Sequence, residues 1–128
     1  MRLRLARHPN RLDARHPIIV EERLSLELLG RQIAVSTMLQ MLRGLHRDGR
    51  GTRWLNKLSG TPLWELKPMS RGGEKGGSRV YLFLIAENEA GVVNCEVKSG
   101  SAADREKLRV GLEVVVGYKN GVPVFEES

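Results

Sequence analysis

The sequence predicts an α+β fold, in which an N-terminal helix or helical hairpin packs on a small curved antiparallel β-sheet and a C-terminal helix follows. Three observations predict it. Apolar residues recur at helical spacing between residues 20 and 46, strand-like runs follow at 63–67, 79–86 and 91–98, and a helical pattern returns at 101–116. With 128 residues, of which 41% are hydrophobic, we expect a single domain over 1–128.

Residues 1–17 form a basic N-terminal extension in this interpretation. Two His-Pro dipeptides, His8-Pro9 and His16-Pro17, disfavour helix, because the residue before a proline is pushed toward extended conformations. We expect a looped segment with a short strand over Arg2–Ala6. Because the segment contributes few apolar residues, its deletion is predicted to spare the fold.

The helical region ends in a glycine-rich turn. Gly30 marks a bend or a break between two helices, and Gly49 and Gly51 are candidate left-handed caps. The predicted apolar face comprises Leu28, Val35, Met38, Leu39, Leu42 and Leu45, and is widened by Leu26, Leu29 and Ile33.

The three strand-like runs are joined so as to pair antiparallel. Leu63–Lys67 alternates with period two, which places Glu65 and Lys67 on one face and Trp64 on the other. The run 79–86 is apolar enough for a strand buried on both faces, and a short turn leads to 91–98.

The C-terminal part predicts a helix over 101–116. Ser101 is the expected N-cap, with Asp104 at the third helical position. The β-branched run at 114–116 argues mildly against helix there, and the Asn-Gly turn signal at 120–121 allows a short final strand.

Positive charge is concentrated in two blocks. The net charge is +6; residues 1–16 carry five arginines against Asp13, and residues 43–79 carry nine Lys or Arg against three acids. Such blocks favour a polyanionic partner over the alternative of a merely solvated face. Aromatic residues make up only 5%, so stacking platforms for bases are not expected to dominate.

Several classes of site and location are disfavoured by composition. Cys95, the single cysteine, cannot form an intrachain disulfide and is expected in the core. No cluster at metal-ligand spacing is visible, and we expect neither a metal nor a small-molecule cofactor. No apolar run approaches the ~18 residues of a membrane span, and the N-terminus lacks a secretory apolar core, so we expect a cytoplasmic protein with no membrane partner.

The connection between the first two strands is longer than pairing requires. Residues 68–78 hold four glycines together with Arg71 and Lys75, whereas a hairpin needs only about two to five turn residues. Flexible backbone and dense positive charge at one place suit a phosphate, because glycine lets backbone amides approach it closely.

The order of these elements resembles the RelE/ParE toxin superfamily of type II toxin–antitoxin modules, in particular its HigB-like, phage-associated branch. The resemblance runs from about Leu39 to Val116, and its most specific parts are "LSGTPLWELK" at 58–67 and "SRVYLFLIAE" at 78–87. It implies a small basic cytoplasmic toxin that a cognate antitoxin neutralises. RelE-like and HigB-like members cleave mRNA in the ribosomal A site, whereas ParE-like members poison DNA gyrase.

Metal-free RNA cleavage explains why such a protein would gather cations. The 2′-hydroxyl attacks the adjacent phosphate, so the site needs a proton acceptor, cations for the developing phosphorane charge and a donor for the leaving oxygen. Clustered cations can lower the pKa of a lysine enough for the first role.

By position, the resemblance implies specific roles. Arg79 would stabilise the phosphorane, and Lys67 or Lys98 would accept the proton. Glu65 would either orient the site or form a salt bridge with Arg79. Further phosphate or RNA contacts are predicted for Arg71, Lys75, Arg53 and Lys57. Because Arg79 begins a strand, its removal is predicted to cost little packing.

Two other functions remain open at this point. One is a non-enzymatic inhibitor of gyrase, and the other is a basic nucleic-acid-binding module without toxicity. The ring of cations at Lys67, Arg71, Arg79 and Lys98 favours the endoribonuclease, since a gyrase inhibitor has no need of cations converging on the sheet.

Overall fold

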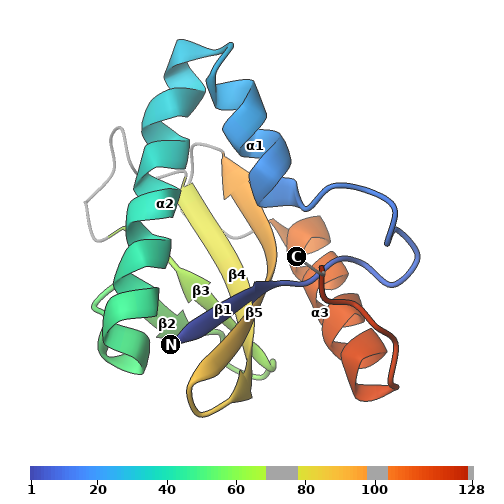
Figure 1. Ribbon diagram of the computed structural model, residues 1–128. Helices are drawn as coiled ribbons and strands as arrows, with labels where there is room; N and C mark the ends of the chain where they lie inside the picture. The colour runs from blue at the N-terminus through green and yellow to red at the C-terminus, as the bar shows by residue number, and fades with distance from the viewer. Residues whose placement is uncertain (69–77, 98–103, 127–128) are drawn as a thin grey trace.

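A five-stranded sheet lies at the centre of the molecule, with two helices packed on one face and one helix on the other (Figure 1). The computed structural model describes residues 1–68, 78–97 and 104–126. The elements are β1 (Arg2–Leu5), α1 (Pro17–Ser25), α2 (Leu29–Asp48), the 3-10 turn η1 (Gly49–Gly51), β2 (Leu55–Lys57), β3 (Leu63–Leu66), β4 (Ser78–Ala86), β5 (Glu89–Val97) and α3 (Arg105–Lys119). The predicted α+β class is therefore confirmed.

The sheet has the strand order β1-β5-β4-β3-β2 and is mixed. The three predicted strands pair antiparallel, as expected, and the short strand β2, which was not predicted, adds to the outer edge of β3. β1 instead runs parallel to β5, with Leu5 opposite Val92. Parallel pairing is possible because α1, α2 and three strands separate the two partners along the chain.

The N-terminal segment is part of this sheet, which corrects the prediction that it can be deleted without harm. Besides forming β1, it buries Ala6 and His16 completely. The Nε2 of His16 lies 2.8 Å from the carbonyl oxygen of Val92, and its Nδ1 accepts the Ile18 N–H at 3.1 Å. Removing residues 1–16 would take away an edge strand and this anchor.

The helical region is a hairpin of two helices, as one of the two predicted alternatives had it. The break falls at residues 26–28, and Gly30 lies inside the first turn of α2. Gly49 is the C-cap of α2 with φ 62° and ψ −142°, a positive φ that suits glycine but lies outside the left-handed helical region. Gly51 lies in η1 without a positive φ, so neither predicted left-handed cap is formed. The guanidinium of Arg31 ties the two helices together by bonding to Glu21, with its Nε at 2.9 Å.

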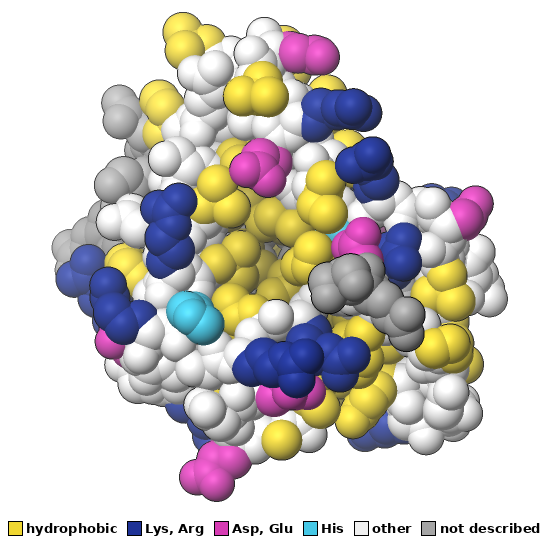
Figure 2. Space-filling model, in the orientation of Figure 1, with side chains coloured by type: hydrophobic (Ala, Val, Ile, Leu, Met, Phe, Trp, Pro, Cys, Tyr) yellow, Lys and Arg dark blue, Asp and Glu magenta, His cyan; other side chains and the backbone are white. Residues whose placement is uncertain are grey.

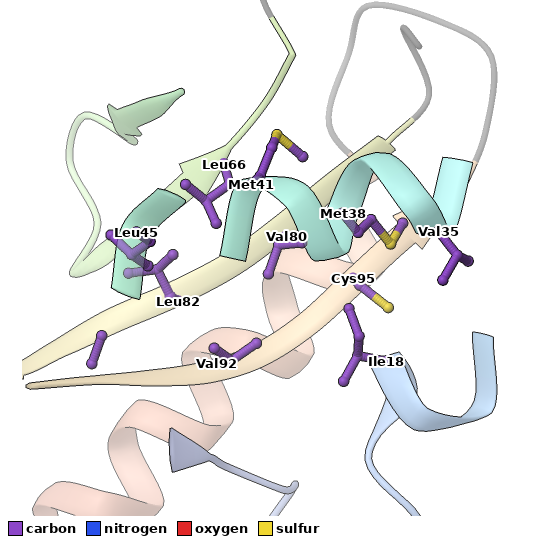
Figure 3. Packing of buried hydrophobic residues seen from close by; sticks show 11 residues of the cluster. Ile18, Val35, Met38, Met41, Leu45, Leu66, Val80, Leu82, Val92 and Cys95 are labelled. Atoms are coloured by element: carbon purple, nitrogen blue, oxygen red, sulfur yellow. The ribbon is translucent and has the colours of Figure 1, made fainter. Parts of the chain in front are cut away.

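The buried face of α2 begins closer to the C-terminal end of the helix than the predicted apolar face. Val35, Met38 and Leu45 are buried as expected, against β4 and β5 (Figure 3). The remaining predicted positions at the hairpin tip are exposed: Leu26 by 78%, Leu28 by 51%, Leu29 by 77% and Ile33 by 49%. The tip projects past the ends of the strands, so no sheet surface lies beneath it (Figure 1).

On the opposite face, α3 packs on the sheet through Val114 and Val115. Its N-cap is Asp104, whose carboxylate accepts the N–H groups of Glu106 at 2.9 Å and Lys107 at 3.2 Å. This corrects the predicted cap at Ser101, a residue outside the described ranges. The helix continues through the β-branched run, and the expected final strand is reduced to a single bridge between Ala6 and Phe125.

Cys95 lies in the core, as predicted, with 1% of its surface exposed. Burial raises the pKa of its thiol to about 12, so the side chain is neutral and unreactive at pH 7. Among the helices that the structure describes, none combines the length and the apolar character needed to cross a bilayer.

Candidate functional site

A buried polar cluster lies on β3, β4 and β5, the strands to which the predicted catalytic residues belong. It is formed by Glu65, Arg79, Tyr81 and Glu96. The Nη1 of Arg79 lies 3.1 Å from Glu65, and the hydroxyl of Tyr81 donates to Glu96 at 2.8 Å. Register places Glu65 opposite Tyr81 and Arg79 opposite Glu96, so β3, β4 and β5 each contribute. The same oxygen of Glu96 also accepts the backbone N–H of Asp104 at 3.2 Å, which links the cluster to the start of α3.

Burial decides what this cluster can do. Arg79 is 3% exposed and Glu65 is 6% exposed, so the salt bridge that the sequence left open is formed inside the protein. The expectation that Arg79 could be removed at little cost is therefore wrong, because a buried carboxylate would lose its counter-charge. The catalytic role of Arg79 stays a prediction.

Sequence reasoning missed Tyr81 and Glu96. The signal for Tyr81 was the strand alternation, which puts it two residues from Arg79 on the same face. Burial and the hydrogen bond to Glu96 raise the pKa of Tyr81, so its hydroxyl stays protonated and acts as a donor.

Lys67 differs from the members of this cluster in being exposed to solvent. It follows the last residue of β3, its side chain is exposed, and its backbone N–H bonds to the carbonyl of Trp54 at 3.0 Å. Three other predicted site residues, Arg71, Lys75 and Lys98, lie outside the described residues. The convergence of Lys67, Arg79 and Lys98 therefore remains a prediction.

A second group of predicted residues does come together, at the β2 edge of the sheet. Arg53 lies over the ring of Trp54, with 4.9 Å from Cζ to the ring centroid. Lys57 lies over Trp64, 5.4 Å from its centroid, and Arg50 over the same ring at 5.2 Å. We call Arg50, Arg53, Trp54, Lys57 and Trp64 the cation–indole surface.

The local fold explains this arrangement. The antiparallel pairing of β2 with β3 sets Lys57 directly opposite Trp64, and the η1 turn after α2 brings Arg50 to the same ring. Gly44 of α2 leaves room for Trp54, since a Cβ at that position would stand 2.4 Å from the indole. Both indoles are half-buried against the core, so they hold the cations at fixed places.

The cation–indole surface is suited to a nucleic acid. Its three cations are exposed, and contact with an aromatic face orients a cation without neutralising it. Arginine and lysine held in this way can bind phosphates, while indole edges and guanidinium planes can contact bases. The contributions of Arg50 and of both tryptophans were not predicted, because they depend on the pairing of β2 with β3.

Basic residues also occur elsewhere on the molecule. On the face drawn in Figure 2, Lys and Arg side chains are spaced around a hollow lined by hydrophobic side chains.

The described residues contain no group of three or more His, Cys, Asp or Glu side chains that could hold a metal ion.

No family model matches this sequence, and no curated protein matches it.

Proposed function

We propose that this protein binds RNA through the cation–indole surface and cleaves it as a metal-independent endoribonuclease. In this proposal it is the toxin of a toxin–antitoxin pair, acts on mRNA at the ribosome and is neutralised by a cognate antitoxin. The observation that carries the proposal is the set of three exposed cations, each of which lies over one of two indole rings.

Lys67 connects binding to cleavage. Its backbone N–H bonds to the carbonyl of Trp54, so the chain at Lys67 runs next to the residue whose ring carries Arg53. We assign the exposed amino group of Lys67 to the scissile phosphate of the bound RNA. An amino group there can stabilise the charge that develops when a 2′-hydroxyl attacks the phosphate. The buried Glu65–Arg79 pair supports the site from inside, by joining the ends of β3 and β4.

A nucleic-acid-binding protein without nuclease activity is the second candidate. One observation favours it: Arg79, the residue to which the resemblance gives the phosphorane, is buried and bonded to Glu65. Gyrase inhibition is tested in the same experiments, as growth arrest accompanied by DNA-damage signalling instead of a block in translation.

The first experiment measures RNA binding. The double variant Arg53→Gln/Lys57→Gln is compared with Arg23→Gln/Lys119→Gln, which removes the same charge from exposed positions on α1 and α3. With a 5′-hydroxyl single-stranded RNA, we expect the first to bind about tenfold or more weakly, and the control to change about twofold or less. Equal losses in both would mean that net charge, and not this surface, provides the affinity.

The second experiment measures cleavage and toxicity of Lys67→Ala, whose side chain is exposed and outside the core. We expect roughly a 10²–10³-fold loss of mRNA cleavage on ribosomes, because a cation that meets the transition state is removed, with an unchanged thermal melt. Absence of cleavage by the unmodified protein, together with normal RNA binding, would instead support the second candidate.

A further inference from the structure

A basic pocket lies on the far side of the molecule from the cation–indole surface. It is a cavity of about 250 Å³ between the 7–15 loop, the middle of β5 and the first turns of α3. The loop contributes Arg7, Arg11 and Arg15, and α3 contributes Lys107. Since β5 and β2 are separated by β4 and β3 in the sheet, the two basic sites are distinct.

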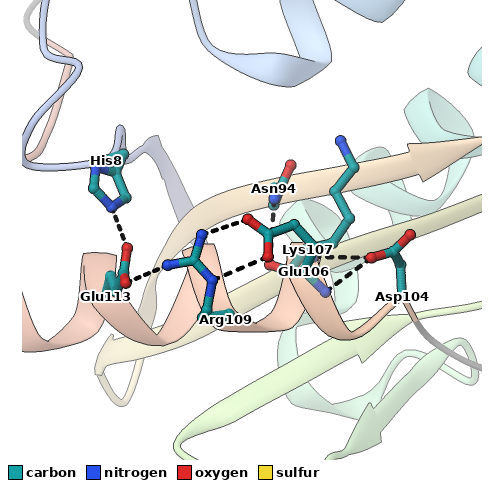
Figure 4. Close-up of polar contacts among 7 residues, drawn as sticks. All are labelled: His8, Asn94, Asp104, Glu106, Lys107, Arg109 and Glu113. Atoms are coloured by element: carbon teal, nitrogen blue, oxygen red, sulfur yellow. Dashed lines mark hydrogen bonds and ion pairs between the residues drawn. The ribbon is translucent and has the colours of Figure 1, made fainter.

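The carboxylates that α3 contributes near this pocket are paired with other side chains. Glu106, the one carboxylate that lines it, accepts a hydrogen bond from the Nε of Arg109 at 3.0 Å. Arg109 also bonds to Glu113 at 2.5 Å, and Glu113 in turn contacts His8 (Figure 4). These contacts lower the pKa of both glutamates, through Arg109 for Glu106 and through His8 first for Glu113, so both remain ionised.

The cations that line the pocket have no such partners. Within residues 1–68, 78–97 and 104–126, the side chains of Arg11, Arg15 and Lys107 form no ion pair. Figure 4 shows the amino group of Lys107 extending away from the Glu106–Arg109–Glu113 chain. The pocket lining therefore presents four positive charges against one glutamate, which is paired with Arg109.

The loop that carries three of these arginines is anchored at both ends. The N–H of Arg7 bonds to Val124 at 2.8 Å, and buried His16 is fixed to Val92. Inside the loop, the Arg11 N–H bonds to His8 at 2.9 Å and the Ala14 N–H bonds to Arg11 at 3.1 Å. The guanidinium of Arg7 donates to the Ala14 carbonyl at 3.0 Å. The backbone that carries these arginines, and the guanidinium of Arg7, are thus held in place before a ligand arrives, which lowers the entropy cost of binding.

We propose that this pocket binds a terminal phosphate, either as a phosphate monoester or as a pyrophosphate. A terminal phosphate carries about −1.5 to −2 charges and three acceptor oxygens at pH 7, which suits several convergent donors better than the single charge of an internal diester. The volume is below the roughly 300–1,000 Å³ of pockets that enclose a whole drug-sized ligand, so it accommodates the phosphate end of a molecule. The source is either a free nucleotide or the 5′ end of an RNA, and the proposal does not depend on the RNA cleavage proposed above.

The test begins with inorganic pyrophosphate as the probe, measured by isothermal titration calorimetry. Two single variants, Arg15→Gln and Lys107→Gln, are compared with Arg23→Gln, which removes one exposed charge from α1 outside the pocket. Each pocket variant is expected to bind about tenfold more weakly, because one charge-assisted hydrogen bond is lost. The control is expected to change by about twofold or less. Thermal melts check that each variant is folded.

A second pair of probes distinguishes the sources. A 5′-monophosphorylated RNA that binds more tightly than its 5′-hydroxyl twin, with the difference abolished by Lys107→Gln, identifies the RNA end. A nucleoside diphosphate that binds without any 5′-phosphate effect identifies a free nucleotide. Failure to bind pyrophosphate, or equal losses in the pocket variants and in Arg23→Gln, would overturn the proposal. The Arg53→Gln/Lys57→Gln variant should retain pyrophosphate binding, so a failure of the RNA-binding proposal is recognised separately.

Discussion

Replacing Arg79 by alanine should destabilise the protein substantially. The side chain is 3% exposed and its Nη1 lies 3.1 Å from Glu65, itself 6% exposed. Removing one partner of a buried pair leaves a desolvated charge behind and costs about 3–5 kcal/mol. Since domains of this size are stable by about 5–15 kcal/mol, Arg79→Ala is expected to unfold at a much lower urea concentration.

A double-mutant cycle separates the ion pair from the general loss of packing. We expect the apolar replacement Arg79→Met/Glu65→Leu to cost less than the sum of its single variants, by about 1–3 kcal/mol of coupling, because neither charge is then left alone. Urea unfolding followed by circular dichroism measures each corner of the cycle. A loss below about 1 kcal/mol for Arg79→Ala would show that this arginine is not held in a buried pair and would refute the reasoning.

This result bears directly on how activity assays are interpreted. If Arg79→Ala loses toxicity because it unfolds, the loss says nothing about chemistry. Lys67→Ala is the cleaner probe of catalysis, since Lys67 is exposed and its only described bond is made by its backbone.

Two further predictions concern stability. Burial lowers the pKa of His16 from 6.5 to about 4, so between these values the unfolded chain binds a proton that the folded chain does not. The contribution of His16 to the free energy of unfolding should be fully present above pH 6.5 and should fall by about 3 kcal/mol toward pH 4. Urea unfolding over this pH range should show a flatter pH dependence for His16→Gln than for the unmodified protein. An equal pH dependence in the two proteins would contradict the prediction. In α2, Gly44→Ala should lower the free energy of unfolding by about 1–3 kcal/mol, because the new Cβ meets Trp54. The measurement is a thermal melt, in which the melting temperature should fall. Gly30→Ala, with nothing within 4 Å, should raise stability by about 0.5–1 kcal/mol; changes of the same sign would contradict the packing.

Local pattern was sufficient to predict the antiparallel strands. Period-two alternation located β3, the apolar run located β4, and short turns required antiparallel pairing. The parallel pairing of β1 with β5 could not be predicted from the sequence, because its register depends on tertiary packing across most of the chain. The exposed tip at Leu26 and Leu29 was misjudged for a similar reason: helical periodicity shows which side is apolar but not where the underlying sheet ends.

The candidate site was predicted in part. Arg53 and Lys57 do lie against neighbouring indoles, but these indoles are brought together by a three-residue strand without a clear pattern. The burial of Arg79 was not predictable from its place at the start of a strand, where charged residues are usually exposed. Asp104 was recognised as a residue of the helix start, although the helix begins later than expected, so Asp104 is the cap.

The most direct test of the account is the salt dependence of RNA binding. For single-stranded RNA, the slope of log K against log salt is about −0.7 for each phosphate neutralised, so the three cations Arg50, Arg53 and Lys57 predict a slope of about −2. With a 5′-hydroxyl RNA, Lys57→Gln should reduce the magnitude of this slope by about 0.7, while Arg23→Gln should leave it unchanged. If Lys57→Gln has the slope of the unmodified protein, RNA does not bind at the cation–indole surface.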